Sequence, residues 1–316
     1  MSGELHVVFG AGQVGEWLGR LLLRSGHQVR LVRKSAGGGP PGATVVQGDA
    51  SNAAFCTEAA RGATTVYHCM NPAYSTRAWA EQLPRYMDNL IAAAGRTGAR
   101  LVVLDNLYML GRPNGRPLSE DSPPNPCSRK GEIRARVAEQ MFAAHRRGDV
   151  LATAGRASDF YGPGAVRSHL GDPFWQPALA GKTARMLLDP DAIHTYHYVL
   201  DVAAGLLALG TAAADAYGQP WMLPCAPAGS LVELVARFSR ALGREIEFVS
   251  LPRLMVKAVG LFVPLVREVD EMTYQWDEPF VVDDRRFRVR FGQQHTDVDE
   301  AAAVTVAWAR EHYQRS

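Results

Sequence analysis

Short apolar runs alternate with longer amphipathic stretches through the first half of the chain. The apolar runs predict six strands, at Leu5–Phe9, Gln28–Val32, Thr44–Gln47, Thr65–His68, Leu101–Leu104 and Val150–Ala154. Short, continuously apolar strands are typical of a parallel sheet buried on both faces. The amphipathic stretches predict helices at Val14–Ser25, Ala53–Ala60, Trp79–Gly95 and Glu132–Arg147. Strands that alternate with helices predict an α/β fold with a doubly wound parallel sheet.

The alternation weakens after about residue 155, where segments rich in proline and aromatic residues begin. We predict that DFYGPG (159–164) and GDPFWQP (171–177) are irregular excursions that build a second, smaller lobe. The remaining pattern predicts helices at Val199–Leu209, Ser230–Leu242 and Val298–Tyr313, and strands near Pro220–Leu223 and Glu245–Val249. We therefore expect an N-terminal sheet domain over residues 1–155, to which a segment at about 190–223 returns. Residues 156–316 are expected to form mainly the second lobe.

Composition and charge exclude several classes of protein. With 47% hydrophobic and 21% charged residues among 316, the chain is not expected to be disordered. It carries 34 Lys and Arg against 32 Asp and Glu, a net charge of +2. This balance provides no broad basic field, so neither nucleic acid nor a membrane is expected as a partner. The apolar segment from Leu251 to Val266 contains Arg253, Lys257 and Pro264, and it predicts an amphipathic or buried helix.

The four cysteines, Cys56, Cys69, Cys127 and Cys225, are widely separated and include no C-x-x-C pair. This spacing argues against a zinc site and against a disulfide framework. The first ten residues predict a strand, where a secretory signal would need a basic start and an apolar stretch. We therefore expect a cytoplasmic protein with reduced thiols.

The segment HVVFGAGQVGEWLGRLLLRSG contains G-x-G-x-x-G between a predicted strand and a predicted helix. In this context Gly10 allows a tight turn, Gly12 allows a pyrophosphate to approach the backbone, and Gly15 allows close packing of helix and strand. The N–H groups at the helix start, which include those of Gln13 and Val14, would face the phosphates. The pattern predicts a Rossmann-type dinucleotide site. The alternative is a glycine-rich turn without a ligand.

The second predicted strand is followed by Arg33 and Lys34, where an NAD-binding unit usually has a carboxylate. A guanidinium can hold a 2′-phosphate in a bidentate clamp, so NADP(H) is predicted in preference to NAD(H). Alternatively, the two residues are a solvated pair that leads into a flexible loop. After the third strand, Asp49 and Ala50 are candidates for contact with the adenosine, although Asp49 could instead cap the following helix.

Several motifs in the same order resemble the extended and atypical short-chain dehydrogenase/reductase group, the NAD-dependent epimerase/dehydratase-like proteins. They are GAGQVG, GDASN, VYHCMNPAY, LVVLDNLYMLG, GRASDFYGPG, IHTYHYVLDVAAGLLALG and, near the C-terminus, FRVRFGQQHTDVDEAAAVTVAW. The resemblance implies a nucleotide-binding N-terminal region and a C-terminal region that selects a small-molecule substrate. It also implies a homodimer through the long helices at Trp79–Gly95 and Glu132–Arg147.

The family's usual Tyr-x-x-x-Lys pair is missing. Alignment with the resembling helix places Gly131 at the tyrosine position and Ala135 at the lysine position, and Asp105 and Asn106 occupy the usual serine positions. The nearest replacement proton donor in sequence is Tyr108, in the loop after the fifth strand. Asn106 could polarise a carbonyl, and the positive charge could come from Lys130, Arg134 or Arg129. Alternatively, Tyr108 packs beneath its loop.

Other candidates follow the strands that end at the same edge of the sheet. In relatives, the positions of Asn71, Pro72 and Tyr74 after the fourth strand, and of Ser158 and Asp159 after the sixth, lie near the nicotinamide and its ribose. Cys69 is a further cofactor contact, with packing as its main role. The aromatic residues Tyr161, Phe174, Trp175, Tyr274 and Trp276 either line an apolar pocket or pack between the lobes.

The segment His194-Thr195-Tyr196-His197-Tyr198 combines two histidines with two tyrosines. Alternation along a strand would place His194, Tyr196 and Tyr198 on one face, with Thr195 and His197 on the other. We therefore expect no metal site there, and expect His194 or Tyr196 to be the members that could face substrate. Asp201 is expected to cap the following helix.

Together these features predict an NADPH-dependent oxidoreductase that reduces a carbonyl or conjugated enone of a small, largely apolar metabolite. One alternative is a nucleotide-sugar epimerase or dehydratase. Such an enzyme needs basic residues in the second lobe, and four arginines are available, Arg237, Arg240, Arg244 and Arg253. Another alternative is a non-catalytic NADP(H)-binding sensor that keeps the phosphate loop and has lost the chemistry.

Overall fold

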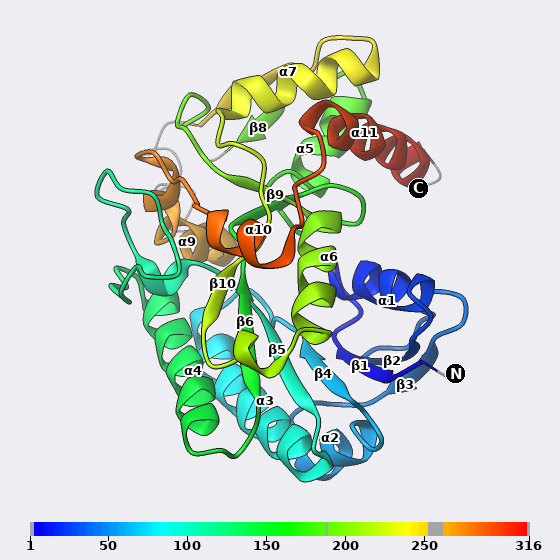
Figure 1. The fold of residues 1–316 in the computed structure, drawn as a ribbon. Coiled ribbons are helices and arrows are strands. Elements are labelled where there is room, and N and C mark those ends of the chain that lie inside the picture. Colours follow the sequence, from blue (N-terminus) through cyan, green and yellow to red (C-terminus); the bar gives the residue numbers. More distant parts are fainter. Residues whose placement is uncertain (1–2, 187–188, 252–261, 315–316) are drawn as a thin grey trace.

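A seven-stranded parallel sheet forms the centre of the N-terminal part of the protein (Figure 1). The computed structural model describes residues 3–186, 189–251 and 262–314. The strand order is β10-β6-β5-β4-β1-β2-β3. The strands are β1 (Leu5–Phe9), β2 (Gln28–Arg33), β3 (Thr44–Gln47), β4 (Thr65–His68), β5 (Arg100–Asp105), β6 (Ala152–Arg156) and β10 (Pro220–Met222). The order reverses between β1 and β4, and ligands of such sheets bind at the carboxyl ends beside this point. The predicted doubly wound sheet is confirmed.

Helices cover both faces of the sheet. On one face α1 (Gly15–Arg24) packs against α6 (Val199–Gly210), and their apolar residues share a core with the strands. The other face carries α2 (Ala53–Ala59), α3 (Thr76–Thr97) and α4 (Arg129–Arg146). Both α3 and α4 begin three residues before the predicted starts, because the Ser75 and Ser128 side chains accept hydrogen bonds from their first turns.

Beyond the central sheet, the described residues form two small parallel sheets and a group of helices. β7 (Asp159–Tyr161) pairs with β9 (Tyr196–Tyr198), and β8 (Ala184–Met186) pairs with β11 (Phe248–Ser250). The helices include α5 (Asp172–Leu179), α7 (Leu231–Leu242), α9 (Pro264–Asp270), α10 (Arg285–Phe291) and α11 (Val298–Gln314). The 3-10 turns are η1 (Tyr108–Leu110), η2 (Ala214–Ala216) and η3 (Thr273–Trp276). Figure 1 shows α5, α7 and α11 at the end of the molecule away from α2 and α3.

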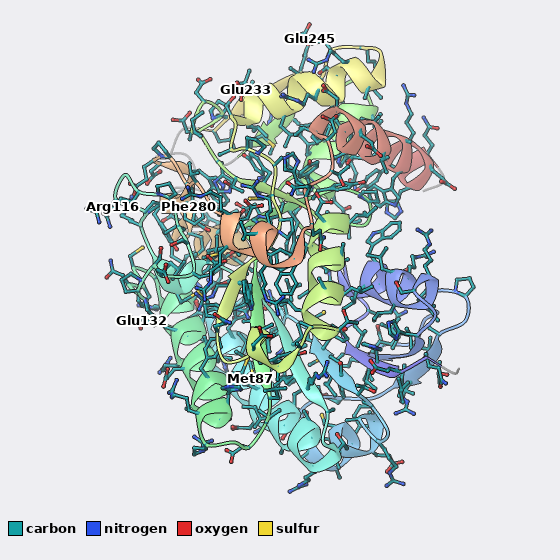
Figure 2. The ribbon with its side chains drawn as sticks, viewed as in Figure 1. Met87, Arg116, Glu132, Glu233, Glu245 and Phe280 are labelled. Carbon is teal, nitrogen blue, oxygen red and sulfur yellow. The ribbon has the colours of Figure 1, made fainter. Side chains whose placement is uncertain are left out.

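Aromatic packing and a helix cap explain how this lobe forms. Phe174 and Trp175 lie with ring centroids 5.0 Å apart, and Phe238 of α7 contacts both. These rings are buried in the lobe, so Phe174 and Trp175 take the core-packing role. At the start of α7, Ser230 forms a reciprocal capping box with Glu233, which is labelled in Figure 2.

Three predictions for the second lobe need correction or lie outside the described residues. Residues Asp172–Leu179 form a helix, not the predicted irregular excursion, because Pro173 stands in the first turn, where its missing N–H costs nothing. The strand predicted at Glu245–Val249 forms at Phe248–Ser250 instead. The helix predicted from Leu251 to Val266 falls mostly on 252–261, which are outside the described residues.

The segment that follows β9 returns to the central sheet. α6 packs on its α1 face, and β10 pairs with β6 and becomes the edge strand of the sheet. The division of the chain at residue 155 stays a prediction. Within the described ranges, we find no helix that is both long and apolar enough to cross a bilayer.

Candidate functional site

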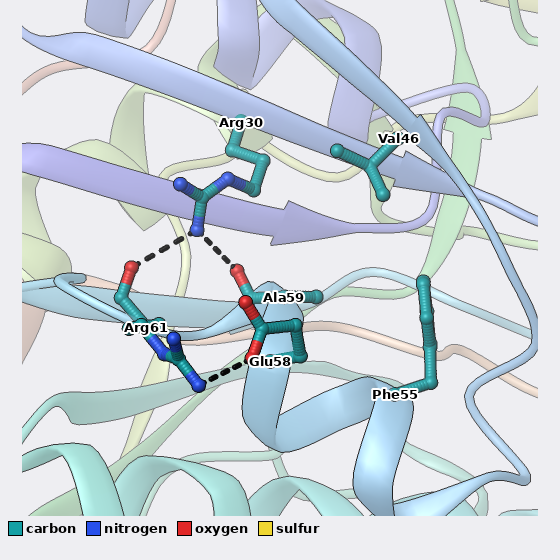
Figure 3. Close-up of a pocket in the computed structure, with 6 residues that line it drawn as sticks. All are labelled: Arg30, Val46, Phe55, Glu58, Ala59 and Arg61. Atoms are coloured by element: carbon teal, nitrogen blue, oxygen red, sulfur yellow. Dashed lines mark hydrogen bonds and ion pairs between the residues drawn. The ribbon is translucent and has the colours of Figure 1, made fainter.

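A cavity of about 260 Å³ lies between β2, β3 and α2 (Figure 3). Both arginines at this cavity are already bound. Arg30 donates to the carbonyls of Ala59 and Arg61, while the Arg61 guanidinium pairs with Glu58. A cation at the last turn of a helix is favoured by the helix dipole. These contacts stabilise the C-terminal end of α2, so the arginines are not available to a ligand. The candidate functional site lies elsewhere.

The phosphate loop follows β1 with the geometry that a dinucleotide needs. Gly10 has a φ of +111°, and a Cβ there would lie 2.7 Å from the Cys69 carbonyl. A Cβ on Gly15 would lie 1.9 Å from the Gly10 oxygen. By contrast, no described atom lies within 4 Å of a Cβ placed on Gly12. The loop is therefore tightly packed against the sheet but open at Gly12, which fits a pyrophosphate at the start of α1.

Gln13 and Val14 have structural contacts at this helix start. The Gln13 Oε1 accepts a hydrogen bond of 2.7 Å from the Arg167 backbone N–H. The Val14 side chain is buried in the core beneath α1. In addition, Trp17 Nε1 donates to the Pro163 carbonyl at 2.7 Å. The 163–167 segment of the second lobe is thus bound to the helix that carries the phosphate loop.

The residues predicted for the adenosine end lie together after β2 and β3. The Arg33 guanidinium donates to the Gly38 carbonyl, and its Nε is buried without a hydrogen-bond partner among the described residues. Lys34 Nζ lies 2.8 Å from Asp49 Oδ2 at the surface. This hydrogen bond, with that of the Ser51 N–H, lowers the pKa of Asp49 to about 2. Ala50 is buried.

Three other predicted cofactor contacts, Cys69, Asn71 and Ser158, bind different parts of the protein. The Cys69 N–H donates to Phe9, and burial raises the pKa of the Cys69 thiol to about 12, so the thiol is neutral. Asn71 accepts a hydrogen bond of 2.8 Å from Arg134. The Ser158 hydroxyl contacts the Thr195 carbonyl and His197 Nδ1, so it joins the sheet to β9.

Tyr108 lies in η1, directly after β5. Its ring stacks on the buried Trp79 at 5.9 Å with an interplanar angle of 10°. Its hydroxyl lies 3.5 Å from the hydroxyl of Tyr74. Burial raises the pKa of Tyr108 to about 12, and the Asp159 charge acts in the same direction. The two tyrosines thus bring a pair of protonated hydroxyls to the carboxyl ends of β4 and β5.

Arg134 of α4 places a positive charge beside Tyr108. Its guanidinium lies 4.7 Å from the Trp79 ring and 3.4 Å from Asp105 Oδ1. Its charge acts against burial and lowers the pKa of Tyr108. Asn106 accepts a hydrogen bond of 3.1 Å from the Tyr108 N–H, so its carbonyl oxygen supports the turn. Tyr108, Asn106 and Arg134 therefore belong to one cluster.

Lys130, also predicted as a source of that charge, has its ammonium bound by two carboxylates. Its side chain is fully buried, and its ammonium donates to Glu268 and to Glu271 Oε1, the latter at 2.6 Å. It also donates to Thr76 Oγ1 at 3.2 Å and lies 4.9 Å from the Tyr74 ring. The carboxylates of α9 and the following turn bind Lys130, so it links α4 to α9.

Replacement of Lys130 by methionine should lower the free energy of unfolding. Loss of the ammonium leaves the carboxylates of Glu268 and Glu271 close together and without their cation, at a cost of about 3 kcal/mol. Urea unfolding should show a lower midpoint. Lys182→Met, at an exposed lysine, is the matched control and should leave the midpoint unchanged. Equal midpoints for both variants would contradict the buried role of Lys130.

A second polar cluster surrounds Asp159 at the junction of the lobes. Asp159 Oδ2 lies 2.9 Å from His194 Nε2 and 3.1 Å from Trp276 Nε1, and its Oδ1 lies 3.9 Å from His169 Nδ1. Burial acts to raise the pKa of Asp159, but the two histidines and Trp276 lower it to about 2. Phe280, labelled in Figure 2, stacks on His194 at 5.3 Å. The site therefore holds a permanent carboxylate.

Sequence reasoning missed His169 and Glu268 at this junction. His169 stands in an irregular loop, and its buried Nε2 has no hydrogen-bond partner in the part of the chain that the structure describes. Neither residue belongs to a motif with fixed spacing. Glu268 lies 138 residues from its partner Lys130, and the His169 ring contacts Trp276 from a distant segment. Only the folded chain brings them together.

Comparisons with known proteins agree with this fold and loop. The sequence pattern of the NAD dependent epimerase/dehydratase family matches residues 6–220, from β1 to β10. A UDP-glucose 4-epimerase from Streptomyces lividans is 28% identical over 234 residues, 70% of this chain. The match spans 66% of that relative's length.

Solved structures with low sequence identity show the same fold. UDP-glucuronic acid 4-epimerase from Bacillus cereus, in complex with UDP-glucuronic acid and NAD, has a TM-score of 0.80 at 15% identity. The match covers 98% of this chain and 100% of that one. dTDP-glucose 4,6-dehydratase from Bacillus anthracis, in complex with NAD, also has a TM-score of 0.80 at 15% identity, over 99% and 98% of the two chains. Because the family pattern covers more than half of its residues, the chain belongs to the NAD dependent epimerase/dehydratase family.

Proposed function

We propose that this protein is a nicotinamide-dinucleotide enzyme that epimerises or dehydrates a nucleotide sugar, with Tyr108 in place of the family's missing tyrosine. The observation that carries the proposal is the pair of hydroxyls of Tyr108 and Tyr74, 3.5 Å apart, with Arg134 on the adjacent indole. This arrangement lies at the carboxyl ends of the strands next to the phosphate loop. Relatives that bind or act on nucleotide sugars support the choice of substrate class.

The residues of the phosphate loop fit the diphosphate of the cofactor. Gly12 offers the open approach, and the N–H groups at the start of α1 offer hydrogen bonds. Asp49 and Ala50 would contact the adenosine, and Asn71 would lie at the nicotinamide end. When bound, the cofactor supplies a hydride acceptor and a positive charge that adds to that of Arg134.

The chain's own residues would handle the proton. Tyr108 would transfer it to or from the substrate oxygen, with Tyr74 as its hydrogen-bonding partner. Arg134 would act through Tyr108, because its charge lowers the pKa of that phenol. Asp159 would accept hydrogen bonds from substrate hydroxyls, since it stays ionised at neutral pH.

The test is a substrate panel. Purified protein is incubated with either dinucleotide and with UDP-glucose, UDP-galactose, UDP-glucuronic acid or dTDP-glucose, and products are identified by NMR. Conversion of at least one sugar without net consumption of cofactor is expected. If no sugar is converted and no sugar binds in calorimetry, the nucleotide-sugar assignment is wrong.

We also propose that Arg33 gives the site a preference for NADP(H). The unpartnered Nε of Arg33 and the lack of a carboxylate at the end of β2 support this choice. Arg33→Ser should weaken NADP⁺ binding about 10- to 100-fold, the equivalent of a lost hydrogen bond to a charged group, and leave NAD⁺ binding unchanged. Calorimetric Kd values measure this, with Arg24→Ser as the control. Tighter binding of NAD⁺ by the unmodified protein would contradict the preference.

A second candidate function is NADPH-dependent reduction of a carbonyl or enone. Three of the arginines considered for a sugar diphosphate are bound elsewhere, which favours this candidate. Arg237 and Arg240 pair with Asp299, and Arg244 donates to the carbonyls of Ala178 and Leu179. Arg253 lies outside the described residues. Stoichiometric NADPH consumption with ketones or enones, and none with sugars, would select this function.

A further inference from the structure

Two histidines and a glutamate meet at the amino ends of β1 and β2, at the end of β1 opposite the phosphate loop (Figure 1). Glu4 precedes β1, His6 is its second residue, and His27 directly precedes β2. The Gln28 N–H donates to the Glu4 carbonyl at 3.0 Å, so the register of the two strands brings Glu4 beside His27. One ligand atom from each of these three residues lies within 4.8 Å of the other two.

The two imidazoles present nitrogens that have no hydrogen-bond partner. His6 is fully buried, and its Nε2 makes no hydrogen bond within the described ranges. The same is true of the buried Nδ1 of His27. The His6 Nε2 lies 3.7 Å from Glu4 Oε2, which is too long for a hydrogen bond. Unpartnered buried nitrogens are costly unless another group binds them.

We propose that Glu4, His6 and His27 bind a divalent transition-metal ion of the zinc class. Two imidazoles and one carboxylate are an established three-residue ligand set for zinc, with water in the fourth position. Zinc bonds of the usual length place neighbouring ligand atoms about 3.4 Å apart in a tetrahedron. The separation of 3.7 Å between His6 and Glu4 requires only a small inward movement. The site joins β1 to β2 and lies outside the dinucleotide site.

A neighbouring hydroxyl completes the site. The His6 Nδ1 lies 2.9 Å from the hydroxyl of the buried Tyr67. If Nδ1 donates to Tyr67, the lone pair of Nε2 is directed away and is free to bind a metal.

Spacing along the chain explains why sequence reasoning predicted no metal. The three residues form no recognised motif, because 20 residues separate His6 from His27. Only the parallel pairing of β1 with β2 brings them together. The cysteines, which the sequence reasoning considered first, do not take part.

Calorimetric titration of chelator-treated full-length protein with Zn²⁺ at neutral pH tests the site. One ion per chain should bind, and Co²⁺ should give the visible spectrum of a tetrahedral N/O site without a thiolate band. His27→Gln and Glu4→Gln should each weaken Zn²⁺ binding at least about 10-fold, and Tyr67→Phe about 10-fold through its effect on His6. His27 and Glu4 are not fully buried, so these variants should fold, as circular dichroism would verify.

Two controls make the outcome decisive. His295→Gln, at a histidine bound to the Thr296 carbonyl, should bind Zn²⁺ like the unmodified protein. Cys127→Ser should do the same, which excludes the exposed thiol as the ligand. The proposal is wrong if the unmodified protein binds no stoichiometric Zn²⁺. It is also wrong if folded His27→Gln and Glu4→Gln both bind with unchanged affinity.

Discussion

Gly15→Ala is expected to weaken dinucleotide binding about 100-fold. The added Cβ would lie 1.9 Å from the Gly10 carbonyl oxygen, which is backbone and cannot rotate away. Gly10 has little room to shift, since a Cβ built on it would lie 2.7 Å from the Cys69 carbonyl. The first turn of α1 must therefore move away from the loop. Overpacking of this kind costs about 1 to 3 kcal/mol, and each 1.4 kcal/mol corresponds to a tenfold change in Kd.

Gly12→Ala distinguishes contact with the ligand from damage to the loop. No described atom lies near a Cβ at Gly12, so this variant should keep its thermal stability and still lose affinity for the dinucleotide. Gly38→Ala, also in open space, should change neither property. Calorimetry and thermal unfolding measure both quantities. A folded Gly15→Ala protein with unchanged Kd would contradict the assigned role of the loop.

The fold could be predicted wherever its determinants are local. β1, β3 and β4 occupy the predicted residues, and a glycine directly follows β1 and β3. Prediction was wrong for α5, because its segment, rich in proline and aromatic residues, was expected to be irregular. A proline is compatible with a first turn, and packing of Phe174 and Trp175 on α7 stabilises the rest.

The candidate site could be predicted only where its residues are close together in sequence. The glycine spacing of the phosphate loop is contained within six residues, and its geometry follows from steric limits on the backbone. The roles of Lys130 and Arg134 depend on partners from other segments. The two residues lie one turn apart on α4. Lys130 is bound by Glu268 of α9 and by Glu271 just after it. Arg134 is bound by Asn71, in the loop after β4, and by Asp105 at the end of β5. No pattern along α4 distinguishes the two cations.

Arg134→Met should change the pH dependence of any turnover that uses Tyr108. The guanidinium lowers the pKa of that phenol, so its removal should raise the pKa above about 12. In the oxidative direction, which needs the phenolate, the rate should then fall at every pH below that pKa, and the alkaline limb should move to higher pH. An unchanged pH profile with lower stability would assign Arg134 a structural role.

Tyr108→Phe is expected to lower kcat about 10²- to 10⁴-fold, the usual contribution of a positioned general acid or base. KM and dinucleotide Kd should stay close to those of the unmodified protein, because the ring still stacks on Trp79 and only the hydroxyl is lost. Tyr74→Phe is the matched control, with a smaller loss, since Tyr74 hydrogen-bonds to Tyr108 and does not itself transfer the proton. Both are measured with whichever substrate of the panels is converted. If the two variants lose activity equally, the pair shares the proton; if Tyr108→Phe retains full turnover, another group performs the transfer.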